Sequence, residues 1–594
     1  MSADAPTAGL PEDLDGPLAW SEDGQPRSRL YGDLYFSAQD GLAESRAVFL
    51  EGCGLPDAWA GRRRFVVGEL GFGTGLNILA LIDLWRRTKP PAGQLHIFSV
   101  EAHPISAQDA ARALANWPEL SEIAEILLAR WPGRALGIHR VDLPELSASL
   151  DLAVMDVEPA LAGWTGRADA WFLDGFAPAL NPAMWRDEVL ALVGRRSAPG
   201  ARAATFTVAG QVRRGLTAAG YAVEKKPGFG RKRERLEARL PGAMAEAQAA
   251  RRIAIVGAGV AGAAAARAAR ALGGEAVVIE AQAPGAGASG NPAALVTPRL
   301  DAGLGPPAQI FAQAFRRAVA LYEDMPNAII SRGVLQLGDQ PRDAERFAKI
   351  ASSNLFEPGT LEVLAAPDAL AQHAALVVEP QAILDAWVPE IVHAAVHGLR
   401  REGGHWVLLD VDGREICRAD AVIVAAAMGS LGLRPELPLR AVRGQASFVE
   451  RFDDAPGAAA WGGYAIPTRT GLLFGATHDR DDAGTEIRPA DHERNLATLA
   501  GARPQLAARL AGAPLDGRAS IRATTPDRLP IAGAAPAEGV FILTGFGSRG
   551  FSLAPLLAEH VAALALGAPS PLPAPLADLV DPDRFRRRAA RRGF

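Results

Sequence analysis

Two glycine-rich loops, each directly after a short apolar run, constrain this 594-residue chain more than any other feature. The first is Glu69-Leu-Gly71-Phe-Gly73-Thr-Gly75, and the second is Gly257-Ala-Gly259-Val-Ala-Gly262. A glycine loop between a strand and a helix lets a ligand approach the backbone at the helix N-terminus. The two loops differ in spacing and lie about one domain length apart. This predicts two different cofactors in two domains.

Strand-like and helix-like segments alternate between residues 60 and 240, which is typical of a doubly wound α/β sheet. Residues 241–251 lack apolar periodicity and resemble a linker. We therefore expect a first domain over residues 1–240 and a second over residues 252–594. The expected strands of the first are Arg64–Val67, Leu95–Val100, Ala170–Leu173 and Ala203–Thr207, with helices at Asn77–Arg87 and Ala107–Ala115.

The cysteine count excludes a disulfide framework and a cysteine-based metal site, because only Cys53 and Cys417 occur. This composition fits a reducing compartment. The N-terminus lacks the pattern of a signal peptide, and no apolar run reaches the roughly 18 residues of a membrane span. We expect a cytoplasmic monomer that binds neither a membrane nor a metal.

Acidic residues flank the first glycine loop. Glu69 precedes the glycines and could face the positive end of a ligand, while Glu101 ends the next strand and could accept both ribose hydroxyls. This arrangement resembles class I S-adenosylmethionine-dependent methyltransferases. A nicotinamide-binding turn or a plain tight turn is the alternative. The predicted cofactor-binding residues here are Glu69, Gly71, Gly73, Gly75 and Glu101.

Asp174 follows a third strand and would lie at the carboxyl edge of the sheet, where ligands of open α/β folds bind. Methyltransferases that act on amines often place Asp or Asn, then Pro and an aromatic residue, at this point. We expect Asp174 to position an amine and not to act as a strong base, because an ordinary Asp has a pKa of about 4. Phe176, Trp171 and Trp185 offer planar surfaces for a base, or are core residues.

The second loop has the full dinucleotide fingerprint, since Glu280 ends the strand after Gly257, Gly259 and Gly262. Three further segments favour FAD over nicotinamide because they match flavoprotein loops in the right order. These segments are Gly287-Ala-Ser289-Gly290-Asn291, Met428-Gly429-Ser430 and Gly547-Ser-Arg549-Gly550. We predict that Gly287, Ser289, Gly290, Gly547 and Gly550 contact the cofactor.

The second half resembles the D-amino-acid oxidase and glycine oxidase family of FAD enzymes, in which an arginine grips the substrate carboxylate. The matching segments indicate Arg522 and Arg549. A planar guanidinium suits a carboxylate because it can donate two parallel hydrogen bonds. The alternative for Arg549 is a surface or cofactor-phosphate contact.

The whole chain resembles the MnmC family of bifunctional tRNA 5-methylaminomethyl-2-thiouridine biosynthesis proteins. The resemblance rests on residues 28–50, the two glycine loops, Phe172–Pro178, Gly287–Asn291, Val442-Arg-Gly-Gln445 and Gly547–Gly550. It implies an N-terminal class I methyltransferase Rossmann-like domain. A FAD-binding Rossmann domain with an inserted mixed α+β substrate domain would follow.

The resemblance also implies two consecutive reactions on the wobble uridine of tRNA. The FAD domain would remove the carboxymethyl group from 5-carboxymethylaminomethyluridine, with glyoxylate as the second product. The methyltransferase domain would then methylate the freed amine with S-adenosylmethionine. Two alternatives remain: an amino-acid or amine oxidase fused to a small-molecule N-methyltransferase without RNA, and a non-catalytic cofactor-bound scaffold.

The net charge of −5 does not indicate a protein devoted to duplex nucleic acid, but basic residues gather locally. An anticodon loop is single-stranded, so its bases can be splayed into pockets while the backbone meets basic side chains. Solvated surfaces or a frayed tail are the alternative. The candidate phosphate contacts are residues 225–239, residues 584–592, Arg195, Arg196, Arg213 and Arg214.

Overall fold

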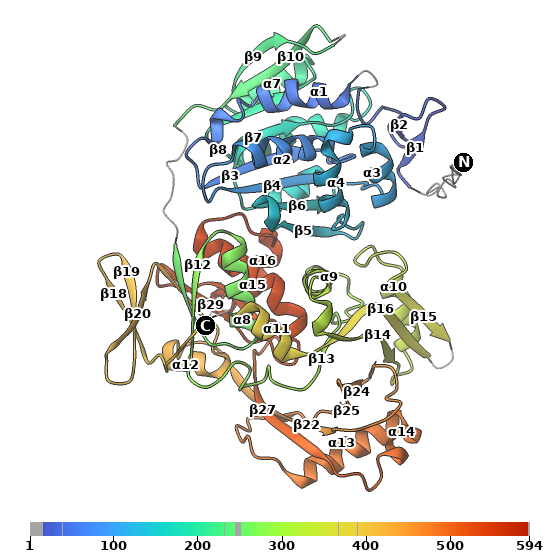
Figure 1. Cartoon of the computed structure of the whole chain (residues 1–594), viewed down its shortest axis with the longest axis vertical. Coiled ribbons are helices and arrows are strands. Elements are labelled where there is room, and N and C mark those ends of the chain that lie inside the picture. The colour runs from blue at the N-terminus through green and yellow to red at the C-terminus, as the bar shows by residue number, and fades with distance from the viewer. Residues whose placement is uncertain are drawn as a thin grey trace, which may run out of the picture. The chain divides into compact units, whose positions relative to one another are not determined.

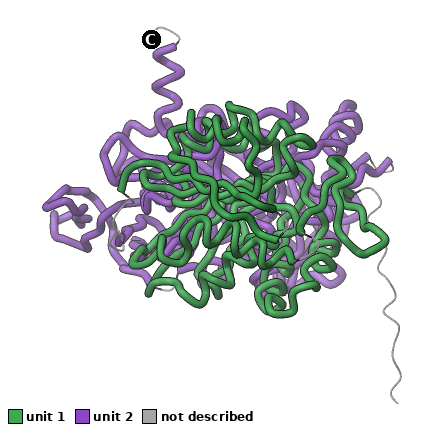
Figure 2. The backbone as a smooth tube through the Cα atoms, turned by 90° about the horizontal axis from the view of Figure 1, so that it is seen from above, with its two compact units in different colours: residues 1–134, 139–162, 167–248 green, residues 135–138, 163–166, 249–594 purple. Residues whose placement is uncertain are grey.

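The computed structural model describes residues 16–37, 40–230, 232–243, 251–365, 368–388 and 390–591. Its contacts divide the chain into two compact units. One unit holds residues 1–134, 139–162 and 167–248, and the other holds residues 135–138, 163–166 and 249–594 (Figure 2). Most of the expected linker, residues 244–250, lies outside the described residues.

The first unit is built on an eight-stranded sheet (Figure 1). Its central strands β6, β4, β3, β7 and β8 pair in parallel, and the hairpin β9–β10 adds antiparallel strands beside β8. In spatial order the strands are β5 (Gly137–Leu143), β6 (Ala148–Val154), β4 (Gln94–Glu101), β3 (Arg64–Leu70), β7 (Ala168–Leu173), β8 (Ser197–Thr205), β10 (Glu234–Arg239) and β9 (Ala222–Pro227).

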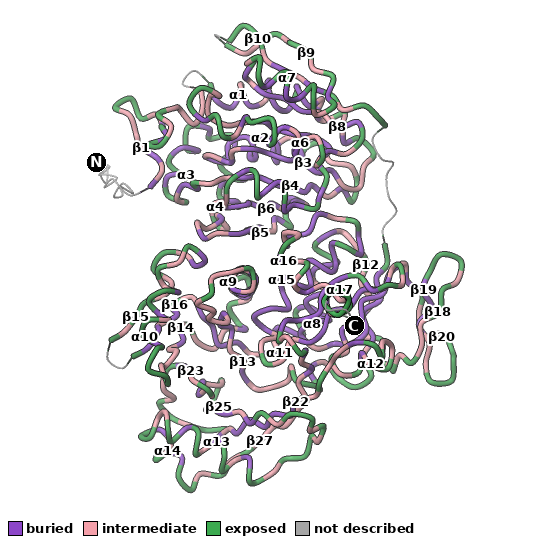
Figure 3. Tube along the Cα trace, turned by 180° about the vertical axis from the view of Figure 1, so that it is seen from behind, coloured by how far each residue is buried: buried purple, intermediate pink, exposed green. Residues whose placement is uncertain are grey.

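The central strands of this sheet are buried on both faces, as alternating helices require, whereas the edge strand β9 has no buried residue. Strand β7 is buried along its whole length, and β3 and β4 are buried along most of theirs (Figure 3). A separate two-stranded ribbon, β1 (Leu18–Trp20) and β2 (Pro26–Ser28), comes before the sheet. The helices are α1 (Gly41–Ser45), α2 (Leu76–Thr88), α3 (Ala107–Leu114), α4 (Ser121–Leu128), α5 (Val157–Gly163), α6 (Asp187–Arg195) and α7 (Gly210–Ala218).

The second unit contains a six-stranded sheet whose strand order places the second glycine loop at its centre. Five strands run in parallel and β28 pairs antiparallel with β29. In spatial order the strands are β17 (Ile391–His393), β12 (Glu275–Glu280), β11 (Arg252–Val256), β21 (Ala421–Val424), β29 (Val540–Thr544) and β28 (Ile531–Ala534). A three-stranded sheet of β18 (Gly398–Glu402), β19 (His405–Leu409) and β20 (Glu415–Ala419) accompanies it.

A ten-stranded mixed sheet forms the rest of the second unit. Its strands come from two stretches of chain that interrupt the six-stranded sheet, so it is inserted in the Rossmann fold. The path is β13 (Ala294–Val296), β16 (Asp368–Val378), β14 (Ile329–Leu337), β23 (Ala459–Ala460), β24 (Tyr464–Pro467), β25 (Leu472–Gly475), β22 (Arg440–Val449) and β26 (Asp479–Arg480), with β15 (Leu361–Ala365) beside β16 and β27 (Asp516–Thr524) beside β22.

Helix α8 (Val260–Ala271) is rich in alanine and almost entirely buried against α15 (Gly550–Leu566), because small side chains let two helices approach closely. No helix among the described residues is both long and apolar enough to cross a membrane. The remaining helices are α9 (Pro306–Glu323), α10 (Asp343–Ala351), α11 (Pro380–Trp387), α12 (Ser430–Leu433), α13 (Pro489–Ala502), α14 (Pro504–Arg509), α16 (Ala574–Val580) and α17 (Arg584–Arg591).

Candidate cofactor and substrate sites

The first glycine loop connects β3 to α2 and needs glycine for its backbone conformation. Gly71, Gly73 and Gly75 have φ angles of +89°, +53° and +78°, in the left-handed region that side chains disfavour. A Cβ on Gly71 would also lie 2.5 Å from the carbonyl oxygen of Asp174. The loop is therefore held close to the end of the neighbouring strand β7.

Glu69 lies beneath this loop with no solvent exposure. Ser99 donates a hydrogen bond to its Oε2 at 2.5 Å, but Oε1 has no hydrogen-bond partner within the part of the chain that the structure describes. Burial raises the pKa of Glu69 well above its usual value. A buried carboxylate oxygen without a partner is costly, and a cationic group in the adjoining loop would offset that cost. This geometry fits the positively charged end of S-adenosylmethionine.

Glu101 ends β4 beside the same loop. Its Oε2 accepts a hydrogen bond from the backbone N–H of Gly73 at 3.1 Å, and its Oε1 accepts one from His103 at 2.9 Å. The carboxylate thus touches the loop that a ribose would contact. The placement of Glu69, Glu101 and the three glycines in one locality agrees with the arrangement expected from the sequence.

Asp174 lies just past the end of β7 and is partly exposed. Asn77, in the first turn of α2, donates a hydrogen bond from Nδ2 to Asp174 Oδ2 at 2.8 Å. The segment around Asp174 is tied further by Asp33, whose Oδ2 accepts a hydrogen bond from the backbone of Ala177 at 3.0 Å. The sequence placed Asn77 near the helix start, but it gave no signal for its contact with Asp174.

The pKa of Asp174 differs from the value near 4 on which its expected role was based. Burial raises the pKa to about 7, and Glu44 adds to the rise, while the hydrogen bond from Asn77 and the charge of Lys232 oppose it. The premise that Asp174 is an ordinary carboxyl is therefore wrong. A carboxyl with a pKa near neutrality can accept a proton at physiological pH.

The aromatic residues near Asp174 divide into two groups. Trp171 and Trp185 have 0% and 1% of their surface exposed, so they are core residues and offer no surface to a base. Phe176 is partly exposed, and its ring lies 5.0 Å from that of Tyr31 and 5.3 Å from that of Tyr35. The contribution of the N-terminal tyrosines could not be predicted, because it depends on a contact across about 140 residues of chain.

The second glycine loop connects β11 to α8 and needs glycine mainly for close packing. Gly257 has a φ of +108°, and a Cβ there would lie 2.8 Å from the carbonyl oxygen of Ala425. A Cβ on Gly262 would lie 1.8 Å from the carbonyl oxygen of Gly257. The third glycine therefore allows helix α8 to lie against the loop, as the fingerprint predicts.

Glu280 and Ser289 both hold this second loop. Glu280 Oε2 accepts a hydrogen bond from Ala258 N–H at 2.7 Å, and Ser289 Oγ accepts one from Val260 N–H at 3.0 Å. Arg518 donates to the carbonyl oxygens of Gly285, Ala286 and Gly287 at 2.5–3.0 Å and so fixes the segment before Gly290. Sequence reasoning missed Arg518, which comes from β27 in the inserted sheet.

A cavity of about 820 Å³ opens beside the second loop. Its volume is in the range of cofactor-binding pockets. Gly262 and Gly290 do not line it and act through backbone packing instead. The expected residues that line it are Gly257, Gly259, Glu280, Gly287, Ser289, Gly547, Gly550, Arg522 and Arg549. This continuous cavity with a glycine-lined end fits an elongated dinucleotide such as FAD.

The two arginines of the cavity lie in different settings. Arg522 is on β27 and donates from Nη1 to the carbonyl oxygen of Thr477 at 3.1 Å, and burial lowers its pKa. Arg549 precedes α15 and lies 3.3 Å from the carbonyl oxygen of Pro298. Burial, with the neighbouring Arg299, lowers the pKa of Arg549 to about 10. Both side chains stay cationic at neutral pH and can hold a carboxylate.

Tyr464 and His478 also line the cavity, and the sequence gave no signal for either. Tyr464 is on β24, and its raised pKa is caused mainly by burial, with Arg522 opposing the rise. Burial and the charge of Arg522 lower the pKa of His478. The inserted sheet thus supplies a mixed polar and cationic wall.

The expected phosphate contacts are partly used within the protein. Arg584 is only 2% exposed and pairs with Asp527 at 3.0 Å, and Arg588 reaches the same carboxylate. Arg586 pairs with Asp583, whereas Arg592 lies outside the described residues. Lys225, Lys226, Lys232 and Arg235 of the 225–239 stretch also form ion pairs, and Arg196 donates to two carbonyl oxygens, whereas Arg195, Arg213 and Arg214 are exposed.

Comparison with known proteins assigns each half of the chain to a protein family. Residues 118–241 match the S-adenosyl-L-methionine-dependent methyltransferase family, and residues 252–564 match the FAD-dependent oxidoreductase family. These matches confirm the two cofactors and the fold class expected from the glycine loops. Within the described residues, no cluster of three or more His, Cys, Asp or Glu side chains could hold a metal ion.

Relatives match over nearly the full length. Two proteins named tRNA 5-methylaminomethyl-2-thiouridine biosynthesis bifunctional protein MnmC are similar, one from Caulobacter sp. (strain K31) and one from Caulobacter vibrioides. The first is 60% identical over 97% of this chain and 98% of the relative, and the second is 62% identical over 96% and 97%. The solved iminodiacetate oxidase from Chelativorans sp. BNC1 is 22% identical, with a TM-score of 0.47 over 56% of this chain and 98% of the oxidase. The chain belongs to the MnmC family of bifunctional proteins, with a methyltransferase and an FAD-dependent oxidoreductase in one polypeptide.

Proposed function

We propose that this protein modifies the wobble uridine of tRNA in two consecutive steps. The FAD site removes the carboxymethyl group of 5-carboxymethylaminomethyl-(2-thio)uridine, and the methyltransferase site methylates the resulting 5-aminomethyl group. The carrying observation is that one chain combines a carboxylate suited to an amine, Asp174, with an arginine-lined cavity suited to an N-substituted glycine. The names of the relatives support tRNA as the substrate.

In the oxidative step, Arg522 and Arg549 hold the substrate carboxylate. When bound, FAD accepts the two electrons removed from the glycine carbon, and S-adenosylmethionine supplies the methyl group at the other site. Water hydrolyses the oxidised carbon–nitrogen bond to glyoxylate and the free 5-aminomethyl group. The cationic pair favours a carboxylate in a buried cavity, since each guanidinium can make charge-assisted hydrogen bonds. The proposed FAD-binding residues are Gly257, Gly259, Gly262, Glu280, Gly287, Ser289, Gly290, Gly547 and Gly550.

In the methylation step, Asp174 orients the amine and accepts its proton. The hydrogen bond from Asn77 fixes the carboxylate, and the pKa of about 7 brings it closer to the pKa of an amine than an ordinary Asp. Glu69, Gly71, Gly73, Gly75 and Glu101 hold S-adenosylmethionine. A carboxyl group with this pKa can take up the proton that the amine releases.

We assign the methyltransferase to residues 1–240, the linker to residues 241–251 and the FAD domain to residues 252–594. The protein acts as a cytoplasmic monomer on the anticodon loop of tRNA. The exposed Arg195, Arg213 and Arg214 are the preferred phosphate contacts, because four arginines of the C-terminal helix already pair with acids.

Nucleoside mass spectrometry of tRNA that carries the carboxymethylaminomethyl group tests this function. Incubation with the FAD-loaded protein should give the aminomethyl nucleoside, and addition of S-adenosylmethionine should give the methylaminomethyl nucleoside. The order is proved if the second product never forms when Arg522→Met abolishes the first. An unchanged wobble nucleoside would reject the tRNA function and favour a small-amine oxidase joined to an N-methyltransferase.

A further inference from the structure

The Val442-Arg-Gly-Gln445 segment of β22 has no role in the proposed chemistry, yet it is packed beside Arg522. Strands β22 and β27 pair antiparallel, with Val442 opposite Arg522. A Cβ on Gly444 would lie 2.3 Å from the central carbon of the Arg522 guanidinium. The guanidinium therefore lies directly on the backbone of Gly444, where no other residue leaves space for it.

Thr477 forms the second contact of Arg522 and is fixed in turn by Gln445. The carbonyl oxygen of Thr477 accepts the hydrogen bond from Arg522. Gln445 N–H donates to Thr477 Oγ1 at 2.9 Å, and Thr477 N–H donates back to the carbonyl oxygen of Gln445 at 3.1 Å. This reciprocal pair of hydrogen bonds fixes the position of the Thr477 carbonyl oxygen relative to the Arg522 guanidinium.

Gln445 is fully buried and both ends of its side-chain amide are used. Its Oε1 accepts hydrogen bonds from Arg443 at 3.1 Å and from the backbone of Arg488 at 2.8 Å, and its Nε2 donates to the carbonyl oxygen of Arg488 at 2.9 Å. Asn495 donates to its carbonyl oxygen at 3.0 Å. Gln445 therefore has one allowed orientation.

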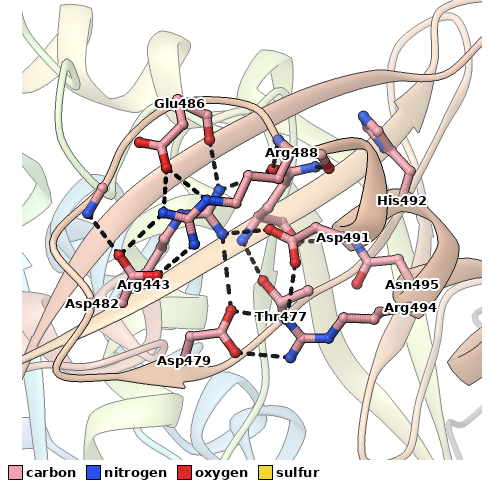
Figure 4. A network of polar contacts seen from close by, with 12 residues as sticks. Arg443, Thr477, Asp479, Asp482, Glu486, Arg488, Asp491, His492, Arg494 and Asn495 are labelled. Carbon is pink, nitrogen blue, oxygen red and sulfur yellow. Dashed lines mark hydrogen bonds and ion pairs between the residues drawn. The ribbon is translucent and has the colours of Figure 1, made fainter.

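Arg443 joins this arrangement to a network of acids (Figure 4). It is fully buried, pairs with Asp491 at 2.5 Å and donates to the carbonyl oxygen of Glu486 at 2.6 Å. A buried ion pair adds little net stability, because desolvation offsets the attraction. In some proteins such a pair instead fixes one arrangement of the surrounding groups, and we infer the same effect here. The hydrogen bonds connect Arg443 to Gln445, Gln445 to Thr477, and Thr477 to Arg522.

We propose that Gly444, Gln445 and Thr477 are positioning residues that set the Arg522 guanidinium for the substrate carboxylate, with Arg443 and Asp491 as their anchor. This inference rests on the proposed role of Arg522 and assigns a purpose to the β22 segment. It predicts that the geometry of carboxylate binding is lost when Gly444 gains a methyl group, although no charge is removed.

Gly444→Ala tests the proposal, with Gly501→Ala as its matched control. Gly501 is in α13 and a Cβ there would meet nothing within 4 Å, so its substitution should leave kinetics unchanged. For Gly444→Ala we expect the KM for carboxymethylaminomethyl-tRNA in flavin reduction to rise by about tenfold or more. Flavin content and methylation of aminomethyl-tRNA should stay at the wild-type level.

Thr477→Val and Thr477→Ser give a milder test that does not depend on tight packing. The valine removes the Oγ1 acceptor and should raise the same KM, whereas the serine keeps the acceptor and should restore it. Wild-type KM values in flavin-loaded Gly444→Ala and Thr477→Val would overturn the positioning role. If Arg522→Met raises KM and these variants do not, only this inference fails. If Arg522→Met also has wild-type KM, the proposed role of Arg522 fails with it.

Discussion

The two glycine loops of this chain have the same surroundings but depend on glycine for different reasons. In each, the first glycine N–H donates to the residue just before an acid, Val100 or Ile279. In each, that acid accepts a backbone hydrogen bond from the loop, Glu101 from Gly73 and Glu280 from Ala258. A common strand order thus gives both loops an acid at the position where the sequence predicts a contact with a ribose.

The differences lie in the backbone and beneath the loop. All three glycines of the first loop have positive φ, whereas Gly259 and Gly262 of the second do not, and Gly262 is required for contact with Gly257. The first loop lies over the buried carboxylate of Glu69, but the second lies over an apolar strand that includes Ile255. A buried carboxyl group can ionise when a cationic cofactor binds beside it, so we expect Glu69 to favour such a cofactor, whereas an apolar strand offers no counter-charge.

The largest effect that separates the loops is expected from Gly262→Val. Its side chain would clash with the carbonyl oxygen of Gly257, and overpacking of this kind costs about 1–3 kcal/mol or more. We expect loss of bound FAD, measured as the flavin absorbance per protein, with retained methylation of aminomethyl-tRNA. Loss of both activities together would contradict the independence of the two sites.

Asp174→Asn should lower the methylation rate by about 100-fold, because the variant loses the proton acceptor. In the wild type, the carboxyl is protonated below its pKa of about 7, so the rate should rise as pH increases through about 7. The variant should lack this rise.

Since the folded pKa lies above the ordinary value, ionisation of Asp174 disfavours folding as pH rises from about 4 to about 7. Asp174→Asn should therefore gain relative thermal stability above neutrality, and a pH-independent difference would contradict the burial of this carboxyl.

Glu69→Gln tests the difference between the groups that lie beneath the two loops. Removal of the negative charge should raise the KM for S-adenosylmethionine by about 10–100-fold, as expected for a lost charge-assisted interaction. Ile255→Val serves as the control in the second loop and should change FAD affinity little. An unchanged KM in Glu69→Gln would show that this carboxylate does not select the cofactor.

The smallest effects are expected from substitution of the two equivalent acids, one beside each loop. Glu101→Gln and Glu280→Gln keep the shape of the side chain and one hydrogen-bond acceptor, so each should weaken only its own cofactor by about tenfold. Isothermal titration with S-adenosylmethionine and with FAD measures both constants on each variant. An effect on the opposite cofactor would break the comparison.

Local spacing determined the features that recur in short stretches of sequence. A strand, a glycine loop, a helix and an acid at the end of the next strand follow one another within about 30 residues, so their order alone predicts the turn and its neighbour. This is why Gly71, Glu101, Gly257 and Glu280 lie where the sequence placed them. The cofactor classes followed from the same local patterns.

Tertiary structure alone decided the features that join distant segments. Three features depend on packing between separate strands and helices. They are the contact of Asn77 with Asp174, the burial that raises the pKa of Asp174 to about 7, and the contact of the Arg522 guanidinium with Gly444. The same holds for Trp171, which is aromatic in the sequence but buried in the fold. A sequence lists which groups are available, whereas dielectric environment and van der Waals exclusion arise only when the chain is packed.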